Sequence, residues 1–325
     1  MWCLTAITMP GFLAMADPSS LLVVLGQPFM QRALLGGLLT GALGGLLGSF
    51  AVLRQLSFFS DALGHSALLG ISLGILLGVN PTLVLIPFAV LFALLVNQLV
   101  DRSGLPADAL LNIVYSTSLA FAVVALSLVE TYRGGIQQLL FGDILGISWS
   151  DLTVIAVLLF AALLYLALSL RAQVLLTLNS DLAGAFGVGA SRHRLAFIML
   201  LAVVVAVSIK AVGVLLISAF VVIPACGGRL VSRHFPRYAL ISAGLGGGCA
   251  LVGLLGSGLT NLPSGPCVVI VQFAGFLLAV MYSQTTRRSR VTAGSAGLQI
   301  LDKGPAVPGS LRSRRNAGEA EDLES

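Results

Sequence analysis

The chain has 325 residues, of which 57% are hydrophobic and only 10% are charged, and its mean hydropathy is +1.01. This composition excludes a soluble globular domain, so the sequence predicts a protein that lies largely within a membrane. The formal net charge of +5 does not indicate a nucleic-acid partner, because seven of the eighteen basic residues follow residue 284 and the others are scattered between apolar runs.

A membrane-spanning helix needs about 20 largely apolar residues. Runs of this kind occur in chain order at 29–53, 61–78, 81–100, 109–129, 152–170, 194–209, 211–228, 238–259 and 266–283. We therefore expect an all-α, polytopic membrane protein whose transmembrane domain covers residues 29–283 and has eight or nine transmembrane helices. The count depends on residues 194–228, which predict either two short helices that meet at SIKAVG (208–213) or one span followed by a broken one.

Two further segments flank this domain. Residues 1–28 lack the basic region that opens a cleaved signal peptide, so we expect them to lie on the membrane surface, unless the chain starts at a later methionine such as Met15. Residues 284–325 are polar and rich in Gly, Ser and Arg, and they cannot bury enough apolar surface to fold alone. We expect them to form a disordered cytoplasmic tail.

Arginines cluster in three segments, at 171–194, at 229–237 and after residue 286. Because loops rich in Arg and Lys stay in the cytoplasm, these segments are predicted to be cytoplasmic, with Arg133 and Lys210 outside. With nine spans the N-terminus is also outside, and a count that differs by one helix reverses this orientation. The sequence thus predicts a multi-pass protein of the plasma (inner) membrane.

Glycines recur at four-residue spacing in the first two spans: Gly37, Gly41 and Gly45 in the first, and Gly70, Gly74 and Gly78 in the second. Small residues at this spacing lie on one helix face and allow neighbouring helix backbones to approach closely in lipid. They predict tight helix packing.

Three ionisable residues in or between the predicted spans stand out: Asp61, His65 and Lys210. Such groups are costly in a membrane and are therefore candidates for function. Asp61 and His65 are four residues apart, so they share one helix face, with Ser72 near it. Imidazole suits zinc, and a carboxylate suits zinc or manganese. Two ligands do not complete a site, but a two-fold dimer would supply four.

From the spacing alone, a second interpretation of Asp61 and His65 stays open, in which they form a buried, hydrogen-bonded pair that fixes helix packing. Lys210 is expected to extend its ammonium group to the membrane surface between two short helices. Glu130 and Asp143 flank a Gly-rich, non-cytoplasmic segment, where they either attract cations or form a solvated face.

Two absences limit the chemistry. The four cysteines are widely separated and form no CxxC pair, which favours free thiols over a disulfide or zinc site: Cys3, Cys226, Cys249 and Cys267. Neither Lys210 nor Lys303 follows a GxxxxGK[ST] pattern, so the chain contains no P-loop. If transport is driven by ATP, the ATPase is a separate polypeptide.

Five stretches, in this order, resemble the integral-membrane permeases of ABC-type zinc, manganese and iron importers. They are RQLSFFSDALGHSALLGISLG (54–74), LLFGDILGISWSDL (139–152), NSDLAGAFGV (179–188), IKAVGVLLISAFVVIPACGGRL (209–230) and LPSGPCVVIV (262–271). The resemblance covers about residues 28–283, which is nearly all of the hydrophobic chain.

This resemblance implies that two permeases, as a homodimer or a related pair, form a central path above two cytosolic ABC ATPases, and that an extracytoplasmic metal-binding protein delivers the metal. Asp61 and His65 match family positions on the metal path. The coupling helix that docks on the ATPase would contain Asp181, Leu182, Ala183, Ala185, Phe186 and Gly187. Asp181 could cap this helix, and Gly187 could end it.

Zinc is the expected cargo, because manganese-type members often have a proline soon after the histidine, where this chain reads HSALLG. Manganese or iron import by the same kind of permease stays open. The resemblance implies a transport subunit without catalysis or a resident cofactor. The alternatives from other classes are a proton-coupled secondary transporter and an intramembrane enzyme that uses Asp61 and His65 as an acid and base pair.

Overall fold

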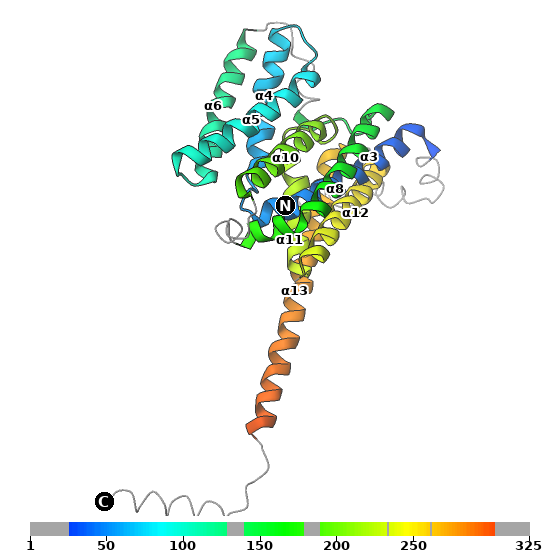
Figure 1. Ribbon diagram of the computed structural model, residues 1–325. Helices are drawn as coiled ribbons and strands as arrows, with labels where there is room; N and C mark the ends of the chain where they lie inside the picture. The colour runs from blue at the N-terminus through cyan, green and yellow to red at the C-terminus, as the bar shows by residue number, and fades with distance from the viewer. Residues whose placement is uncertain (1–25, 129–139, 179–188, 233, 261, 303–325) are drawn as a thin grey trace, which may run out of the picture. The chain divides into compact units, whose positions relative to one another are not determined.

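The computed structural model describes residues 26–128, 140–178, 189–232, 234–260 and 262–302. Within these ranges the chain forms nine α-helices and no strand, so the predicted all-α fold is confirmed (Figure 1). They are α3 (Pro28–Leu53), α4 (Phe59–Leu76), α5 (Pro81–Ser103), α6 (Ala107–Ser127), α8 (Trp149–Leu178), α10 (Ala190–Val212), α11 (Ile217–Val231), α12 (Phe235–Thr260) and α13 (Ser264–Asp302). Eight of these described helices are long and apolar enough to cross a membrane, and α11 is shorter.

Residues 190–231 settle the question that the sequence left open. Helix α10 begins at Ala190 rather than at 194 and has 23 residues, which is enough for a full span. The chain then breaks at Gly213, whose φ of 88° is accessible to glycine, and α11 follows with 15 residues. Of the two alternatives, one full span followed by an interrupted segment is therefore confirmed, and two short helices are wrong. The polar residues after Ala190 belong to α10 but do not continue the apolar run, so the sequence pattern places the start of the helix too late.

Helix α3 packs against α12 through its glycines. A Cβ atom at Gly41 would overlap the main-chain carbonyl of Gly246, and one at Gly45 would overlap the carbonyl of Ser242. Because glycine has no side chain, the two backbones touch directly, which is how helices associate where lipid removes the hydrophobic driving force. The predicted close packing of the first span is confirmed.

The glycines of α4 face α5. A Cβ atom at Gly70 would lie 2.8 Å from the ring of Phe88, and one at Gly74 would lie 3.1 Å from the Cα of Pro81. Gly78 differs from the prediction, because α4 ends at Leu76 and Gly78 has a φ of 67° with nothing near its Cβ position. It forms the turn after the helix instead of a packing surface.

The helices differ in how much of their apolar surface they bury: in the most apolar part of α3, 72% is buried, against 28% in α5 and in α8. Phe50, Phe59 and Phe197 are among the largest fully buried side chains, and they come from α3, α4 and α10. Helices α5 and α8 instead expose large apolar side chains such as Leu91 and Phe160. In a bilayer these exposed side chains face lipid, so exposure of apolar surface carries no cost there.

Residues up to Val280 form one compact unit, and a second unit begins at Met281. Helix α13 remains helical to Asp302, whereas the sequence predicts a disordered tail from residue 284. A helix that is already formed lengthens at one hydrogen bond per residue without a new nucleation step, so it can continue into a polar sequence. Residues 303–325 of the predicted tail and residues 1–25 of the predicted N-terminal segment lie outside the described residues.

Candidate functional site

Asp61 and His65 lie in the first two turns of α4, one turn apart. The His65 Nδ1 lies 3.0 Å from the main-chain carbonyl oxygen of Asp61. Because a carbonyl oxygen can only accept, Nδ1 carries a proton and donates it, and in the neutral ring the lone pair of Nε2 is left for another partner. A backbone hydrogen bond on one ring nitrogen is the usual arrangement in a histidine that binds metal through the other.

The two side chains do not form a closed pair. The His65 Nδ1 is 3.7 Å from Oδ1 of Asp61, which is too long for a hydrogen bond. The His65 side chain is 21% exposed and that of Asp61 is 30% exposed. Both groups therefore remain accessible on one face of α4, which disfavours the interpretation as a buried pair that only fixes packing.

Tyr115 of α6 contacts this face, and the sequence did not single it out. Its ring meets that of His65 edge to face, with 5.2 Å between centroids, and meets that of Phe58 at 6.3 Å. Ser72, predicted near the same face, is instead buried and donates its hydroxyl to the Leu69 carbonyl at 2.8 Å. The sequence does show Tyr115 as a tyrosine within an apolar span, which could have marked it as a candidate. Its position beside His65, however, depends on tertiary packing.

Within the described part of the chain, no three His, Cys, Asp or Glu residues lie close enough to hold a metal ion together. Asp61 and His65 of one copy therefore supply only two protein donors. Structural zinc sites use four, and catalytic ones use three with an open position. Further donors for a bound ion would have to come from water, from a second copy or from the cargo's own ligands.

Three of the sequence stretches that carry the family resemblance meet at the C-terminal end of α10. Gly142, with a φ of 73°, lies against the backbone of Gly213, and a Cβ atom at Gly265 would lie 3.2 Å from the carbonyl oxygen of Phe141. The Leu215 N–H donates to the carbonyl of Leu140 at 3.1 Å. Because this backbone contact has no room for side chains, the glycines are required here by close approach.

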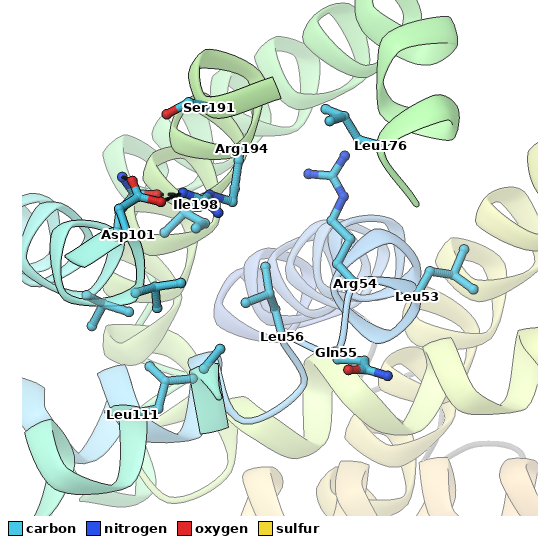
Figure 2. Close-up of a pocket in the computed structure, with 14 residues that line it drawn as sticks. Leu53, Arg54, Gln55, Leu56, Asp101, Leu111, Leu176, Ser191, Arg194 and Ile198 are labelled. Carbon is cyan, nitrogen blue, oxygen red and sulfur yellow. Dashed lines mark hydrogen bonds and ion pairs between the residues drawn. The ribbon is translucent and has the colours of Figure 1, made fainter. Parts of the chain in front are cut away.

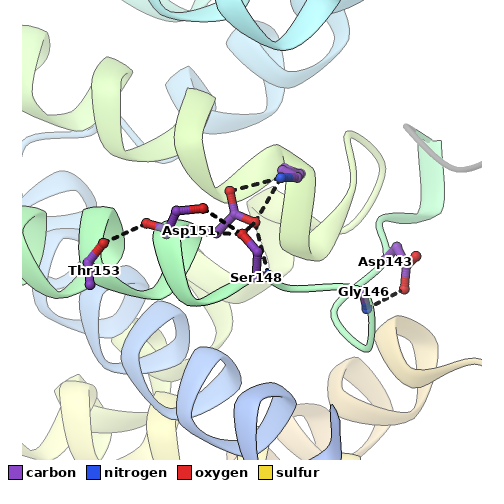
Figure 3. A network of polar contacts seen from close by, with 7 residues as sticks. Asp143, Gly146, Ser148, Asp151 and Thr153 are labelled. Atoms are coloured by element: carbon purple, nitrogen blue, oxygen red, sulfur yellow. Dashed lines mark hydrogen bonds and ion pairs between the residues drawn. The ribbon is translucent and has the colours of Figure 1, made fainter.

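The same region contains an ion pair that the sequence did not predict. The Lys210 Nζ lies 2.8 Å from each carboxylate oxygen of Asp151, which also accepts the Ser148 hydroxyl at 2.6 Å (Figure 3). Lys210 was expected between two short helices, but it lies in the last turn of the full-length α10. The pairing was missed because Asp151 is 59 residues away in sequence.

Of the two acidic residues predicted around the Gly-rich segment, Asp143 accepts the Gly146 N–H at 2.9 Å (Figure 3). The Asp143 N–H donates to the Lys210 carbonyl. Glu130 lies outside the described residues. So does the whole predicted coupling segment, from Asp181 to Gly187. The helices on either side of it are described: α8 ends at Leu178 and α10 begins at Ala190.

The long apolar helices, packed through glycines and exposing apolar side chains, define a multi-pass membrane protein. The chain belongs to the ABC 3 transport family, whose sequence profile matches residues 26–283, and this membership agrees with the predicted location in the plasma membrane. The predicted family resemblance is thereby confirmed.

Individual relatives agree with this assignment. The high-affinity zinc uptake system membrane protein ZnuB of Haemophilus influenzae is 32% identical over 76% of this chain and 95% of its own length. The manganese import system permease protein ScaB of Streptococcus parasanguinis is 27% identical over 81% of this chain and 93% of its own. Among solved structures, PsaBC from Streptococcus pneumoniae has a TM-score of 0.71 at 24% identity, covering 81% of this chain and 95% of that one, and shows the same fold.

Proposed function

We propose that this chain is the permease subunit of an ABC importer for a divalent transition metal, with zinc as its cargo. The observation that carries the proposal is the geometry of Asp61 and His65. One carboxylate and one imidazole, whose Nδ1 is engaged by the Asp61 carbonyl so that Nε2 is left for another partner, lie on the same accessible face of α4. These are the donor types that zinc and manganese accept, and their presence in a membrane span needs a compensating role.

In this proposal a second copy of the permease completes the path. Two copies related by a two-fold axis would bring two carboxylates and two imidazoles to one point, which is the donor number of a tetrahedral site. The partial exposure of both side chains supports this arrangement, because a surface that remains open in one copy can be shared with the other. The metal then exchanges hydration for protein ligands as it crosses.

The choice of zinc rests on two observations. The residues after His65 read SALLG, without the proline expected of manganese-type members. The identity to the zinc uptake protein of Haemophilus influenzae, 32%, also exceeds the 27% identity to the streptococcal manganese permease. Manganese or iron import by the same site is the alternative cargo assignment.

Two partners belong to the proposal. A cytosolic ABC ATPase would dock on the segment Asp181–Gly187, which joins α8 to α10 at the end of the bundle that is rich in arginines. The lack of a P-loop in this chain makes a separate ATPase necessary for ATP-driven transport. An extracytoplasmic metal-binding protein would deliver the ion at the opposite end of the bundle.

Proteoliposomes that contain this chain, its ATPase and its binding protein test the proposal. We expect ATP-dependent zinc uptake that falls to background in Asp61→Ala and in His65→Ala. His234→Ala is the matched control, because His234 is exposed and has no part in the predicted path. Uptake that needs a proton gradient but no ATP would favour a secondary transporter, and undiminished uptake in both site variants would remove the site assignment.

The cargo is measured separately, by competition among Zn²⁺, Mn²⁺ and Fe²⁺ in cells that lack other importers. Zinc is expected to displace the other two at the lowest concentration. Preferential uptake of Mn²⁺ or Fe²⁺ with the same dependence on Asp61 and His65 would support the permease assignment but replace zinc as the proposed cargo.

A further inference from the structure

A cavity of about 610 Å³ lies among the ends of α3, α5, α6, α8 and α10 (Figure 2). This volume is in the range of small-molecule sites, about 300–1,000 Å³. Apolar side chains such as Leu56, Val100 and Leu111 form much of its wall. The lining includes neither Asp61 nor His65, so the cavity is separate from the proposed metal site.

Arg54 lines this cavity, and its polar contacts leave its charge uncompensated. Its guanidinium donates to the side-chain oxygen of Gln173 and, at 3.4 Å, to the Gln173 carbonyl, and it lies 4.6 Å from the ring centroid of Phe197. All three partners are neutral. Its Nε is buried without a hydrogen-bond partner, and within the described ranges Arg54 belongs to no ion pair.

Burial lowers the pKa of the Arg54 guanidinium to about 10, so the group is still protonated at neutral pH. A partly buried cation with a spare donor is unfavourable unless an anion or water meets it. The second arginine of the cavity, Arg194, is already neutralised, because it pairs with Asp101 and donates to Asn97 at 3.2 Å. An anionic ligand would therefore gain more binding free energy from contact with Arg54 than from contact with Arg194.

The turn that presents Arg54 is strained. Helix α3 ends with the Leu56 N–H donating to the Ala51 carbonyl at 2.9 Å, and Gln55 between them has a φ of 58°. Glycine is the usual residue in this left-handed position, because other residues lose conformational energy there. A residue kept in such a conformation often belongs to a ligand site, and Gln55 lines the same cavity (Figure 2).

We propose that this cavity binds an anionic phospholipid of the cytoplasmic leaflet, with the headgroup phosphate on Arg54 and the first part of the acyl chains along the apolar wall. The ends of α3 and α10 that form the cavity carry Arg54 and Arg194, and the positive-inside rule places this end in the cytoplasm. Basic pockets between helices on that side of a membrane suit lipid headgroups. A concave site with one cation that lacks an anionic partner among the described residues, and with apolar walls, fits an anionic amphiphile better than a free ion.

The bound lipid would also touch both helices that flank the predicted coupling segment. Leu176, near the end of α8, and Ser191, at the start of α10, line the cavity. Occupancy would therefore stabilise the position of these two helix ends, and lipid composition would influence transport through them.

The test uses the full chain reconstituted in vesicles of phosphatidylcholine mixed with phosphatidylglycerol, then extracted, with retained phosphatidylglycerol counted by native mass spectrometry. We expect the wild-type chain to retain this lipid and Arg54→Gln to bind it about tenfold less tightly, as for loss of one charge-assisted hydrogen bond. The matched control is Arg102→Gln, because Arg102 lies in the last turn of α5 outside the cavity lining. An equal loss in both variants, or no loss in Arg54→Gln, overturns the proposal.

A second variant covers the case in which Arg54→Gln does not fold. Ala107→Trp fills the cavity from the start of α6 and leaves Arg54 in place, so it should also release the lipid. Retention at the wild-type level in Ala107→Trp contradicts binding inside the cavity. Titration with inorganic phosphate in the absence of phosphatidylglycerol distinguishes the two sources of phosphate: phosphate binding as tight as that of the lipid, and equally dependent on Arg54, overturns the lipid assignment in favour of a free-anion site.

Discussion

The Nζ of Lys210 lies 2.8 Å from both carboxylate oxygens of Asp151, and so joins the last turn of α10 to the first turn of α8. The Lys210 side chain is 47% exposed and that of Asp151 is 23% exposed. Next to this pair the backbones around Gly142 and Gly213 touch. The ion pair therefore holds together the loop where three stretches of the family pattern meet.

The ion pair should contribute modestly to stability. We expect Lys210→Met and Asp151→Asn each to lower the free energy of unfolding, with a coupling energy of about 1 kcal/mol in the double-mutant cycle, because both side chains remain partly solvated. Unfolding of the purified wild-type chain, the two single variants and the double variant in detergent measures the coupling energy. Strictly additive effects of the two substitutions would show that the pair contributes no interaction energy.

Metal stoichiometry should reveal the shared site. If two copies of Asp61 and His65 hold one ion, titration of the purified permease with Zn²⁺ gives about 0.5 ion per chain. His65→Ala should abolish this binding, and His193→Ala, which alters a histidine outside α4, should preserve it. A ratio of one ion per chain would contradict a site that needs both copies.

Tyr115 should act through the orientation of the His65 ring. We expect Tyr115→Ala to weaken Zn²⁺ binding by about threefold to tenfold, the range of an aromatic pair, and Tyr115→Phe to preserve it, because the ring contact does not need the hydroxyl. Isothermal titration of both variants measures the difference. Equal losses in the two variants would assign the effect to the hydroxyl and not to the packed ring.

The contact between α3 and α12 should be intolerant of a single methyl group. Gly45→Ala places a Cβ atom on the Ser242 carbonyl, so we expect a loss of about 1–3 kcal/mol in unfolding free energy. Gly248→Ala on α12 is the matched control, because nothing lies within 4 Å of its Cβ position, and alanine there should be neutral or stabilising. Similar free energies of unfolding for the two variants would exclude the overlap with the Ser242 carbonyl as the cause of any destabilisation in Gly45→Ala.

The predicted coupling segment should govern association with the ATPase. We expect Asp181→Arg and Gly187→Pro to prevent co-purification with the ATPase subunit, while the permease still elutes as a folded species in detergent. Substitution in the loop before α5, such as Val79→Lys, should leave association unchanged. Full co-purification of the two segment variants would place the docking surface elsewhere.

Much of the architecture could be predicted from the sequence, since a span in lipid must be apolar and must satisfy its own backbone hydrogen bonds. Length and composition therefore determined an all-helical membrane protein, and four-residue glycine spacing identified the close contacts of α3 and α4. The five ordered stretches identified the family. Helix ends were less certain, as at α10, because polar residues in a first turn interrupt an apolar run without interrupting a helix.

Other features were decided only by tertiary structure. The sequence placed Asp61 and His65 on one face, but which ring nitrogen is occupied, and the presence of Tyr115 beside it, depend on how α4 packs on α6. Lys210 meets Asp151, and Arg54 meets no anionic side chain of the described residues, because of contacts between segments far apart in the chain. Local periodicity specifies which way a side chain faces along its own helix, whereas the partner that it meets is set by the arrangement of neighbouring helices.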